Sequence, residues 1–187
     1  MIWVTSDLHF NHPGILRMSR SRFSSVEEHN EYIIKKYNGK VGKDDLVYIL
    51  GDLGFTPLKD LAPLVKRLNG RKILILGNHD KGVIGEYYAM GFIEVYDHPV
   101  YFSNEIILSH EPCQEALNNP YVFNIHGHTH LRDLTPNNYI NVCVEKTDYE
   151  PLDLKALQEK IKPLVKRRTE RFGKEWYYNL YNFSENA

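Results

Sequence analysis

Cysteine, long apolar runs and an excess of charge of one sign are all scarce in this 187-residue chain. Its two cysteines, Cys113 and Cys143, form no CxxC pattern, which excludes a disulfide framework and fits a reducing compartment. No apolar run approaches the roughly 18 residues that a membrane-spanning helix needs. The first residues also lack the basic start and apolar stretch of a signal peptide. We therefore expect a cytoplasmic protein with no membrane partner.

The charge balance and the length favour one ordinary globular domain. The formal net charge is −1, so no overall positive field attracts nucleic acid or an anionic membrane. Apolar residues make up 42% of the chain, which is enough for a sizeable core, and neither internal repeats nor Gly/Ser linkers divide it. We expect a single domain over residues 1–187.

Short apolar runs alternate with helical patterns in the first half of the chain. We expect strands at Ile2–Val4, Leu46–Leu50 and Lys72–Leu76, a helix from the capping box at Ser25 to about Tyr37, and helices over Leu58–Leu68 and Val83–Met90. The second half is mostly β, with strands expected at Ile93–Tyr96, Val100–Phe102, Glu105–Ser109, Val122–His126 and Tyr139–Val144, and a hairpin turn at Ser103-Asn104. Asp153 is expected to cap a last helix, which Pro163 should kink or split. These elements indicate an α/β domain with helices on both sides of its sheet, or with its strands in two packed sheets.

Polar side chains follow the predicted strands at the points where the strands end. The motifs are Asp7-Leu8-His9, Gly51-Asp52, Gly77-Asn78-His79-Asp80, Ser109-His110 and Gly127-His128-Thr129-His130. Ligand sites of open α/β sheets lie beyond the carboxyl ends of strands, so these motifs are expected to meet. Each motif alone is weak, because an isolated histidine is usually an ordinary surface or core residue. Five motifs at five strand ends indicate a site.

A buried set of aspartates and histidines is costly without a compensating charge, and two divalent cations would supply it. The D-x-H and H-x-H spacings place alternate side chains on the same side of an extended segment. Mixed imidazole and carboxylate ligands suit Mn, Fe, Zn, Co or Ni better than Ca or Mg. The glycines before Asp52, Asn78 and His128 permit sharp turns or close backbone approach.

The order of these motifs, D-x-H, GD, GNHD, H and GHTH, resembles that of the calcineurin-like metallophosphoesterase family from Asp7 to His130. Phe10-Asn11-His12-Pro13 is similar to a subgroup of small, single-domain bacterial and phage-type members. The resemblance implies an α/β fold of two mixed β-sheets, packed as a sandwich and flanked by helices. Phe55 departs from the family pattern, because many members carry an acidic residue at this position.

The resemblance also implies roles for the motif residues. Asp7, His9 and His130 would bind a first metal ion, Asp52 would bridge both ions, and Asn78, His110 and His128 would bind the second. His79 would face the substrate as the catalytic proton donor, oriented by Asp80. The two ions would be divalent, with manganese favoured and Fe, Zn, Ni or Co as alternatives.

These roles predict a phosphoesterase. A hydroxide bridging the two metals would attack phosphorus in line and cleave a phosphomonoester or a phosphodiester. The alternative is a catalytically silent binding scaffold with the same fold, which would be free to lose Asp52, Asn78 or His79. All three are present. A phosphoprotein phosphatase would share the chemistry, but no recognition surface for it is evident.

The roles of several residues outside the motifs are not decided by the sequence. Asn11, His12, Arg17, Arg20 and Arg22 are candidates for substrate-phosphate contacts, and each is otherwise a solvated loop residue. His126 is left out of the ligand set. His29 and His98 are expected at the surface, and the two cysteines are expected to be partly buried free thiols.

An aromatic tail at about 171–187 is expected to form a helix that covers the sheet edge or the core. A dimer surface and base stacking are the alternatives for it, so the chain is expected to be a monomer or a homodimer. The expected partner is a phosphate-ester substrate, and a nucleotide is one candidate for it. Nucleic acid fits the chemistry, but nothing in the sequence supports it.

Overall fold

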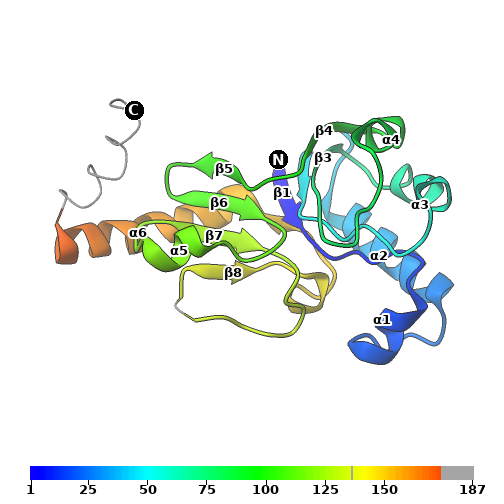
Figure 1. Ribbon diagram of the computed structural model, residues 1–187, viewed down its shortest axis with the longest axis horizontal. Helices are drawn as coiled ribbons and strands as arrows, with labels where there is room; N and C mark the ends of the chain where they lie inside the picture. The colour runs from blue at the N-terminus through cyan, green and yellow to red at the C-terminus, as the bar shows by residue number, and fades with distance from the viewer. Residues whose placement is uncertain (136, 174–187) are drawn as a thin grey trace.

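The computed structural model describes residues 1–135 and 137–173 and arranges them as two packed β-sheets flanked by helices (Figure 1). The first sheet has the order β4-β3-β2-β1-β9. Its strands are β1 (Ile2–Thr5), β2 (Leu46–Ile49), β3 (Arg71–Ile75), β4 (Phe92–Tyr96) and β9 (Leu152–Asp153). β1 to β4 run parallel, whereas β9 pairs antiparallel with β1.

The second sheet is also mixed and has the order β5-β6-β7-β8. Its strands are β5 (Val100–Ser103), β6 (Ile106–Ser109), β7 (Phe123–His126) and β8 (Tyr139–Asn141). β5 and β6 form an antiparallel hairpin, with its turn at residues 104–105, one residue later than predicted, and the other pairs are parallel. The predicted fold class, two mixed sheets with flanking helices, is confirmed.

Six helices accompany the sheets in the described residues. They are α1 (Pro13–Met18), α2 (Val26–Lys40), α3 (Leu58–Val65), α4 (Ile84–Ala89), α5 (Gln114–Asn118) and α6 (Leu154–Phe172). A 3-10 turn, η1 (Val144–Lys146), follows β8. α1 and α5 were not predicted, because one or two turns are too short to show a helical period. Ser25 caps α2 by accepting a hydrogen bond from the Glu28 amide, as predicted, but the Glu28 carboxylate accepts from Ser24 and does not complete the capping box.

Pro163 does not divide α6, which continues from Leu154 to Phe172. The predicted split is therefore wrong, and its alternative, a kink, stays a prediction. Ile161 and Val165, on either side of the proline, are both buried in the core between the helix and the sheets. Their burial offsets the loss of the one helical hydrogen bond that proline cannot donate. Asp153 caps this helix through the amides of Lys155 and Ala156.

Alternate residues of the first sheet belong to two different cores, because side chains along a strand point to opposite faces. Trp3, Val47 and Leu74 pack against α2, α3 and α4, whereas Val4 and Ile75 pack toward the second sheet and α6. Figure 1 shows α2, α3 and α4 beside the first sheet and α6 behind the second.

No helix within residues 1–135 and 137–173 is long and apolar enough to cross a membrane. The aromatic tail that was expected at about 171–187 lies outside the described residues from 174 onward.

Candidate metal centre

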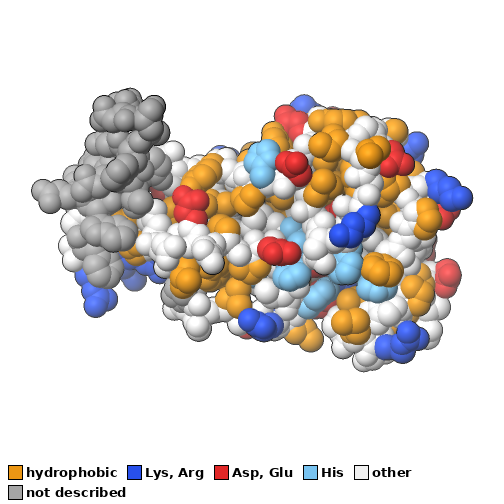
Figure 2. Space-filling model, viewed as in Figure 1, with side chains coloured by type: hydrophobic (Ala, Val, Ile, Leu, Met, Phe, Trp, Pro, Cys, Tyr) orange, Lys and Arg blue, Asp and Glu red, His pale blue; other side chains and the backbone are white. Residues whose placement is uncertain are grey.

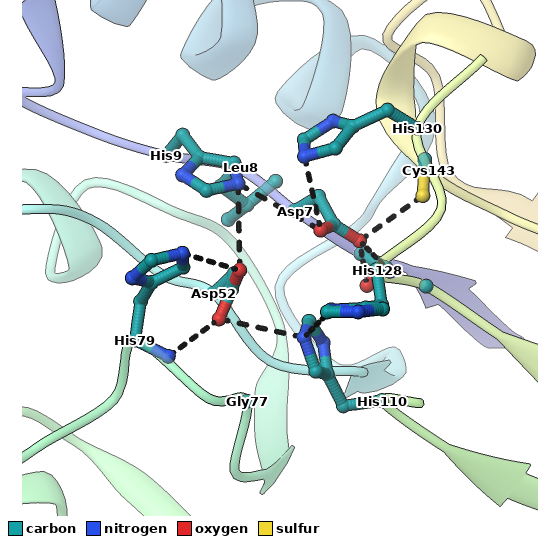
Figure 3. Close-up of polar contacts among 12 residues, drawn as sticks. Asp7, Leu8, His9, Asp52, Gly77, His79, His110, His128, His130 and Cys143 are labelled. Atoms are coloured by element: carbon teal, nitrogen blue, oxygen red, sulfur yellow. Dashed lines mark hydrogen bonds and ion pairs between the residues drawn. The ribbon is translucent and has the colours of Figure 1, made fainter. Parts of the chain in front are cut away.

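The five predicted motifs meet where the two sheets adjoin (Figure 3). The loops after β1, β2 and β3 contribute from the first sheet, and the loops after β6 and β7 contribute from the second. A parallel bridge between Ser6 and Cys143 joins the two sheets at this point. Figure 2 shows histidine side chains gathered on one face of the molecule.

Asp7 is completely buried, and its two carboxylate oxygens have different surroundings. The protein occupies Oδ2, which accepts hydrogen bonds from the His128 amide at 2.9 Å and from the Cys143 thiol at 3.2 Å. Oδ1 faces the Nε2 atoms of His9 and His130, at 3.7 and 3.9 Å. One oxygen therefore anchors the side chain, and the other points into the centre.

Asp52 lies between two groups of candidate ligands. The first group is Asp7, His9 and His130, and the second is Asn78, His110 and His128. Its Oδ2 is 3.5 Å from His9 Nε2, and its Oδ1 is 3.5 Å from His110 Nε2. Oδ1 also accepts a hydrogen bond from the His79 amide at 3.0 Å, which fixes the carboxylate plane. Each oxygen thus faces a different group, as a bridging carboxylate would.

The second group consists of Asn78, His110 and His128. Asn78 Oδ1 lies 2.9 Å from His110 Nε2 and 3.0 Å from His128 Nδ1, and the two nitrogens are 3.2 Å apart. Ligand atoms about 2.1 Å from one ion are spaced at roughly 3.0–3.4 Å, so these separations match a shared cation. His110 is buried, whereas Asn78 and His128 are more exposed, so this side of the centre opens to solvent.

The surroundings of two atoms in the first group show whether a cation fits there. Asp7 Oδ1 and His9 Nε2 are buried and have no hydrogen-bond partner among the described residues. A buried polar atom without a partner costs free energy unless something else binds it. The ligand atoms of Asp7, His9 and His130 lie within 4.8 Å of one another, as do those of Asp7, Asp52 and His110. These residues fit divalent cations, and Asp52 adjoins both groups.

The backbone at the centre is in an uncommon conformation. Five of the seven predicted ligands have a positive φ, and they are Asp7 (59°), His9 (49°), Asp52 (53°), His128 (65°) and His130 (49°). The prediction that D-x-H and H-x-H are extended segments is therefore wrong, because their alternate residues are left-handed. Such residues cost about 1–3 kcal/mol each and persist where surrounding contacts hold them, which is common at functional sites.

Two glycines allow the loops to approach closely, as their positions predicted. A Cβ on Gly127 would lie 1.9 Å from Ser6 Oγ and 2.3 Å from Asp7 Oδ2, and a Cβ on Gly77 would lie 2.3 Å from Asp52 Oδ1. Any side chain at either position would displace an aspartate of the centre.

Asp80 does not orient the His79 ring, contrary to the prediction. Its carboxylate accepts hydrogen bonds from the amides of Asp52, Leu53 and Gly77, at 2.8, 3.1 and 2.8 Å. These bonds join the loop after β2 to the loop after β3. Burial raises the pKa of Asp80 to about 6, although the amide donors favour its ionised form.

A buried ion pair lies behind the first group. Glu145, on η1, accepts hydrogen bonds from Arg20 Nε and pairs with His130 Nδ1, both at 2.8 Å. Arg20 also donates to the main-chain carbonyls of Asp7 and Leu8, at 2.5 and 2.9 Å. Burial raises the pKa of Glu145, but His130 and Arg20 outweigh it and lower the pKa to about 2. The pair thus holds both Asp7 and His130 in place.

Two predictions are wrong at this ion pair. Arg20 is 1% exposed and all three of its guanidinium nitrogens contact protein atoms, so it is not placed to contact a substrate. His29 is buried rather than at the surface, and its Nε2 is 2.8 Å from Arg20 Nη1. Burial and the charge of Arg20 lower the pKa of His29 to about 3, so the neutral ring accepts this hydrogen bond.

Glu145 was missed in the sequence, although a signal was present. It directly follows the predicted strand Tyr139–Val144, at the same kind of position as the five motifs. Cys143 was expected to be partly buried, but it is fully buried and contacts Asp7. His126 is buried with its Nδ1 paired to the Gly127 carbonyl, and His98 is exposed as predicted.

The remaining candidates for substrate contacts fall in different places. His12 lies at the mouth of the centre, with its Nδ1 3.1 Å from His9 Nδ1. Asn11 is instead tied to α2, because its Oδ1 accepts a hydrogen bond from Asn30 at 2.7 Å. Arg22 lies over the Tyr32 ring and beside Asp148. Asn11 and Arg22 therefore support the fold at these contacts, while Arg17, exposed on α1, stays a prediction.

Comparisons with known proteins agree with this geometry. A family model described as calcineurin-like phosphoesterase matches residues 1–176. The uncharacterised protein MJ1445 of Methanocaldococcus jannaschii is 36% identical over 162 residues, which cover 82% of this chain and 86% of that protein. The gene 66 protein of Mycobacterium phage L5 is 32% identical over 164 residues, which cover 68% and 76% of the two chains.

A solved structure resembles this fold over most of the chain. AQ665 of Aquifex aeolicus, described as a protein of unknown function, matches with a TM-score of 0.67 at 27% identity. The match covers 85% of this chain and 98% of that one. The predicted resemblance to small members of the family is confirmed.

Proposed function

The chain belongs to the calcineurin-like phosphoesterase family, and from this premise we propose that it is a hydrolase of phosphomonoesters or phosphodiesters that depends on two divalent cations. The observation that carries the proposal is the pair of buried atoms, Asp7 Oδ1 and His9 Nε2, that have no partner among the described residues. They lie 3.7 Å apart, and His9 Nε2 is 3.5 Å from Asp52 Oδ2, the oxygen that faces away from the second group. A cation is the partner that these atoms lack.

The metal ligands of this chain would form two sets, one for each cation. Asp7, His9 and His130 would hold the first cation, Asn78, His110 and His128 the second, and Asp52 would contact both. When bound, two such cations supply positive charge to the phosphoryl oxygens and lower the pKa of a coordinated water. Manganese is the metal that we favour, because the donors mix imidazole nitrogen with carboxylate and amide oxygen.

His79 would act on the leaving group. Its ring stands at the edge of the centre, with Nε2 3.9 Å from Asp52 Oδ2 and the side chain 36% exposed. It is thus close to the cations without being enclosed among the ligands, as a proton donor to the leaving oxygen must be. Asp80 contributes indirectly, because it holds the loop that carries His79 against the loop that carries Asp52.

The test of the function is hydrolysis of bis(p-nitrophenyl) phosphate and p-nitrophenyl phosphate by protein stripped of metal and then reloaded with manganese. We expect release of p-nitrophenol only after reloading, and the ratio of the two rates will distinguish a diesterase from a monoesterase. Folded protein that binds manganese and cleaves neither ester would contradict the proposal.

His79→Ala is expected to lower turnover by about 10²–10⁴-fold without loss of metal, because a general acid contributes on that scale. The loss should be largest with alkyl esters, whose leaving oxygens need a proton more than p-nitrophenolate does. Metal content and rates with both kinds of ester are the measurements. His98→Ala, which removes a histidine exposed far more than His79, is the matched control. Loss of manganese from His79→Ala would instead make His79 a ligand.

A further inference from the structure

A cavity of about 530 Å³ opens beside His79. It is lined by residues 54–58, Leu61, residues 79–82 and Glu86. Much of the wall is apolar and includes Phe55, Leu58 and Leu61. His79 and Asp80 belong both to this wall and to the loop that carries Asn78, so the cavity adjoins the metal centre.

Phe55 contributes an exposed aromatic ring to the cavity wall. Its side chain is 52% exposed, although it is held by two rings. The His12 ring stacks on it, with centroids 4.4 Å apart and planes at 18°, and the His79 ring meets it edge-on at 5.1 Å. A lone exposed phenylalanine is ordinary. Here, two rings of the centre position it at the mouth, so its exposed surface is presented beside the reacting groups.

The position of His79 decides which part of a substrate would reach the cavity. With the phosphorus near Asp52 and the leaving oxygen near His79, the rest of the leaving group extends past His79 toward Phe55. A volume of about 530 Å³ falls in the range of small-molecule sites and suits a ring system larger than a simple alkyl group. Polar side chains also line it, and two of them, Lys81 and Glu86, are exposed.

We propose that this cavity binds the nucleoside of a nucleotide ester, with the base stacked on Phe55. Every nucleobase offers a flat π face, and an aromatic side chain binds that face whatever the base. Lys81 and Glu86 can pair with the polar edge of the base or with the sugar. The inference rests on the proposed function, because it places the phosphate at the metal centre.

The experiment compares two ligands that carry the same phosphate. Binding of adenosine 5′-monophosphate and of ribose 5-phosphate to manganese-loaded protein is measured by calorimetry, with inorganic phosphate assayed afterwards. If either ligand is hydrolysed, the two KM values are compared instead. We expect the nucleotide to bind about tenfold more tightly, which is the scale of one base stacked on one aromatic side chain.

Phe55→Ala is expected to remove this preference, and Phe55→Tyr to keep it. Tyr88→Ala, which removes an aromatic ring that is 48% exposed outside the cavity, should leave it unchanged. Equal affinity for the two ligands in the unaltered protein, or a preference that survives Phe55→Ala, would overturn the inference. The same preparations are assayed with bis(p-nitrophenyl) phosphate. Hydrolysis of this ester without a preference for the nucleotide would reject nucleoside binding in the cavity alone. A preference for the nucleotide without hydrolysis would reject the catalytic proposal.

Discussion

Asp52→Asn is expected to reduce manganese-dependent hydrolysis by at least about 10³-fold, more than the loss of one hydrogen-bond donor that stabilises a transition state. The substitution keeps the size of the side chain and the oxygen that accepts from the His79 amide. It removes the negative charge and the second carboxylate oxygen from the position between His9 and His110. Because these two nitrogens belong to different groups, one substitution weakens both cation positions.

The measurement is the manganese content of the purified variant together with its rate toward bis(p-nitrophenyl) phosphate. Asp60→Asn, at an exposed aspartate on α3, is the control for loss of one carboxylate charge and should keep both values. A variant at Asp52 that still binds two ions and hydrolyses the ester at an unchanged rate would show that the carboxylate does not bridge them.

Glu145→Ala is expected to lower the free energy of unfolding by about 3–5 kcal/mol, because it leaves the Arg20 guanidinium buried without its anion. It is also expected to weaken manganese binding by about 10–100-fold. Glu145 fixes His130 Nδ1, and through Arg20 it fixes the main chain at Asp7. Both effects follow from the same pair of 2.8 Å contacts.

Denaturant unfolding of the metal-free protein measures the first effect, and manganese titration measures the second. Glu145→Gln keeps an acceptor of the same size and serves if the alanine variant does not fold. Glu150→Gln breaks the surface ion pairs with Lys36 and Lys40 and should change neither value appreciably. If the Glu145 variants matched the unaltered protein in both measurements, Glu145 would not position the centre.

The positions of most strands along the chain and the motifs at their ends could be predicted from the sequence, because both depend on local patterns. Strand and helix periods report which face of a segment is buried, and turn residues report where it stops. This is why Asp7, Asp52 and His110 could be placed at the ends of strands. Short elements such as α1 and α5, with one or two turns each, carry too few residues for such a pattern.

Contacts between distant segments could not be predicted in this way. Arg20 and Glu145 are 125 positions apart, and nothing near either residue indicates the other. As a result Arg20 was predicted to bind substrate and His29 to lie at the surface, whereas both are buried behind Asp7. Asp80 was assigned to its neighbour His79, but its carboxylate instead holds the amides of three backbone positions, two of them 27 and 28 residues away.

The sequence by itself determined the family, the donor set of the proposed metal centre and most of the strands, because these depend on residue type, order and local period. Only the tertiary structure decided which oxygen of Asp7 is anchored and which is free, that five of the seven proposed ligands have a left-handed backbone, and that Phe55 stands beside His79 at a cavity. Those properties depend on how the ends of two sheets are packed together. Burial and partner choice are set by that packing and not by any single segment.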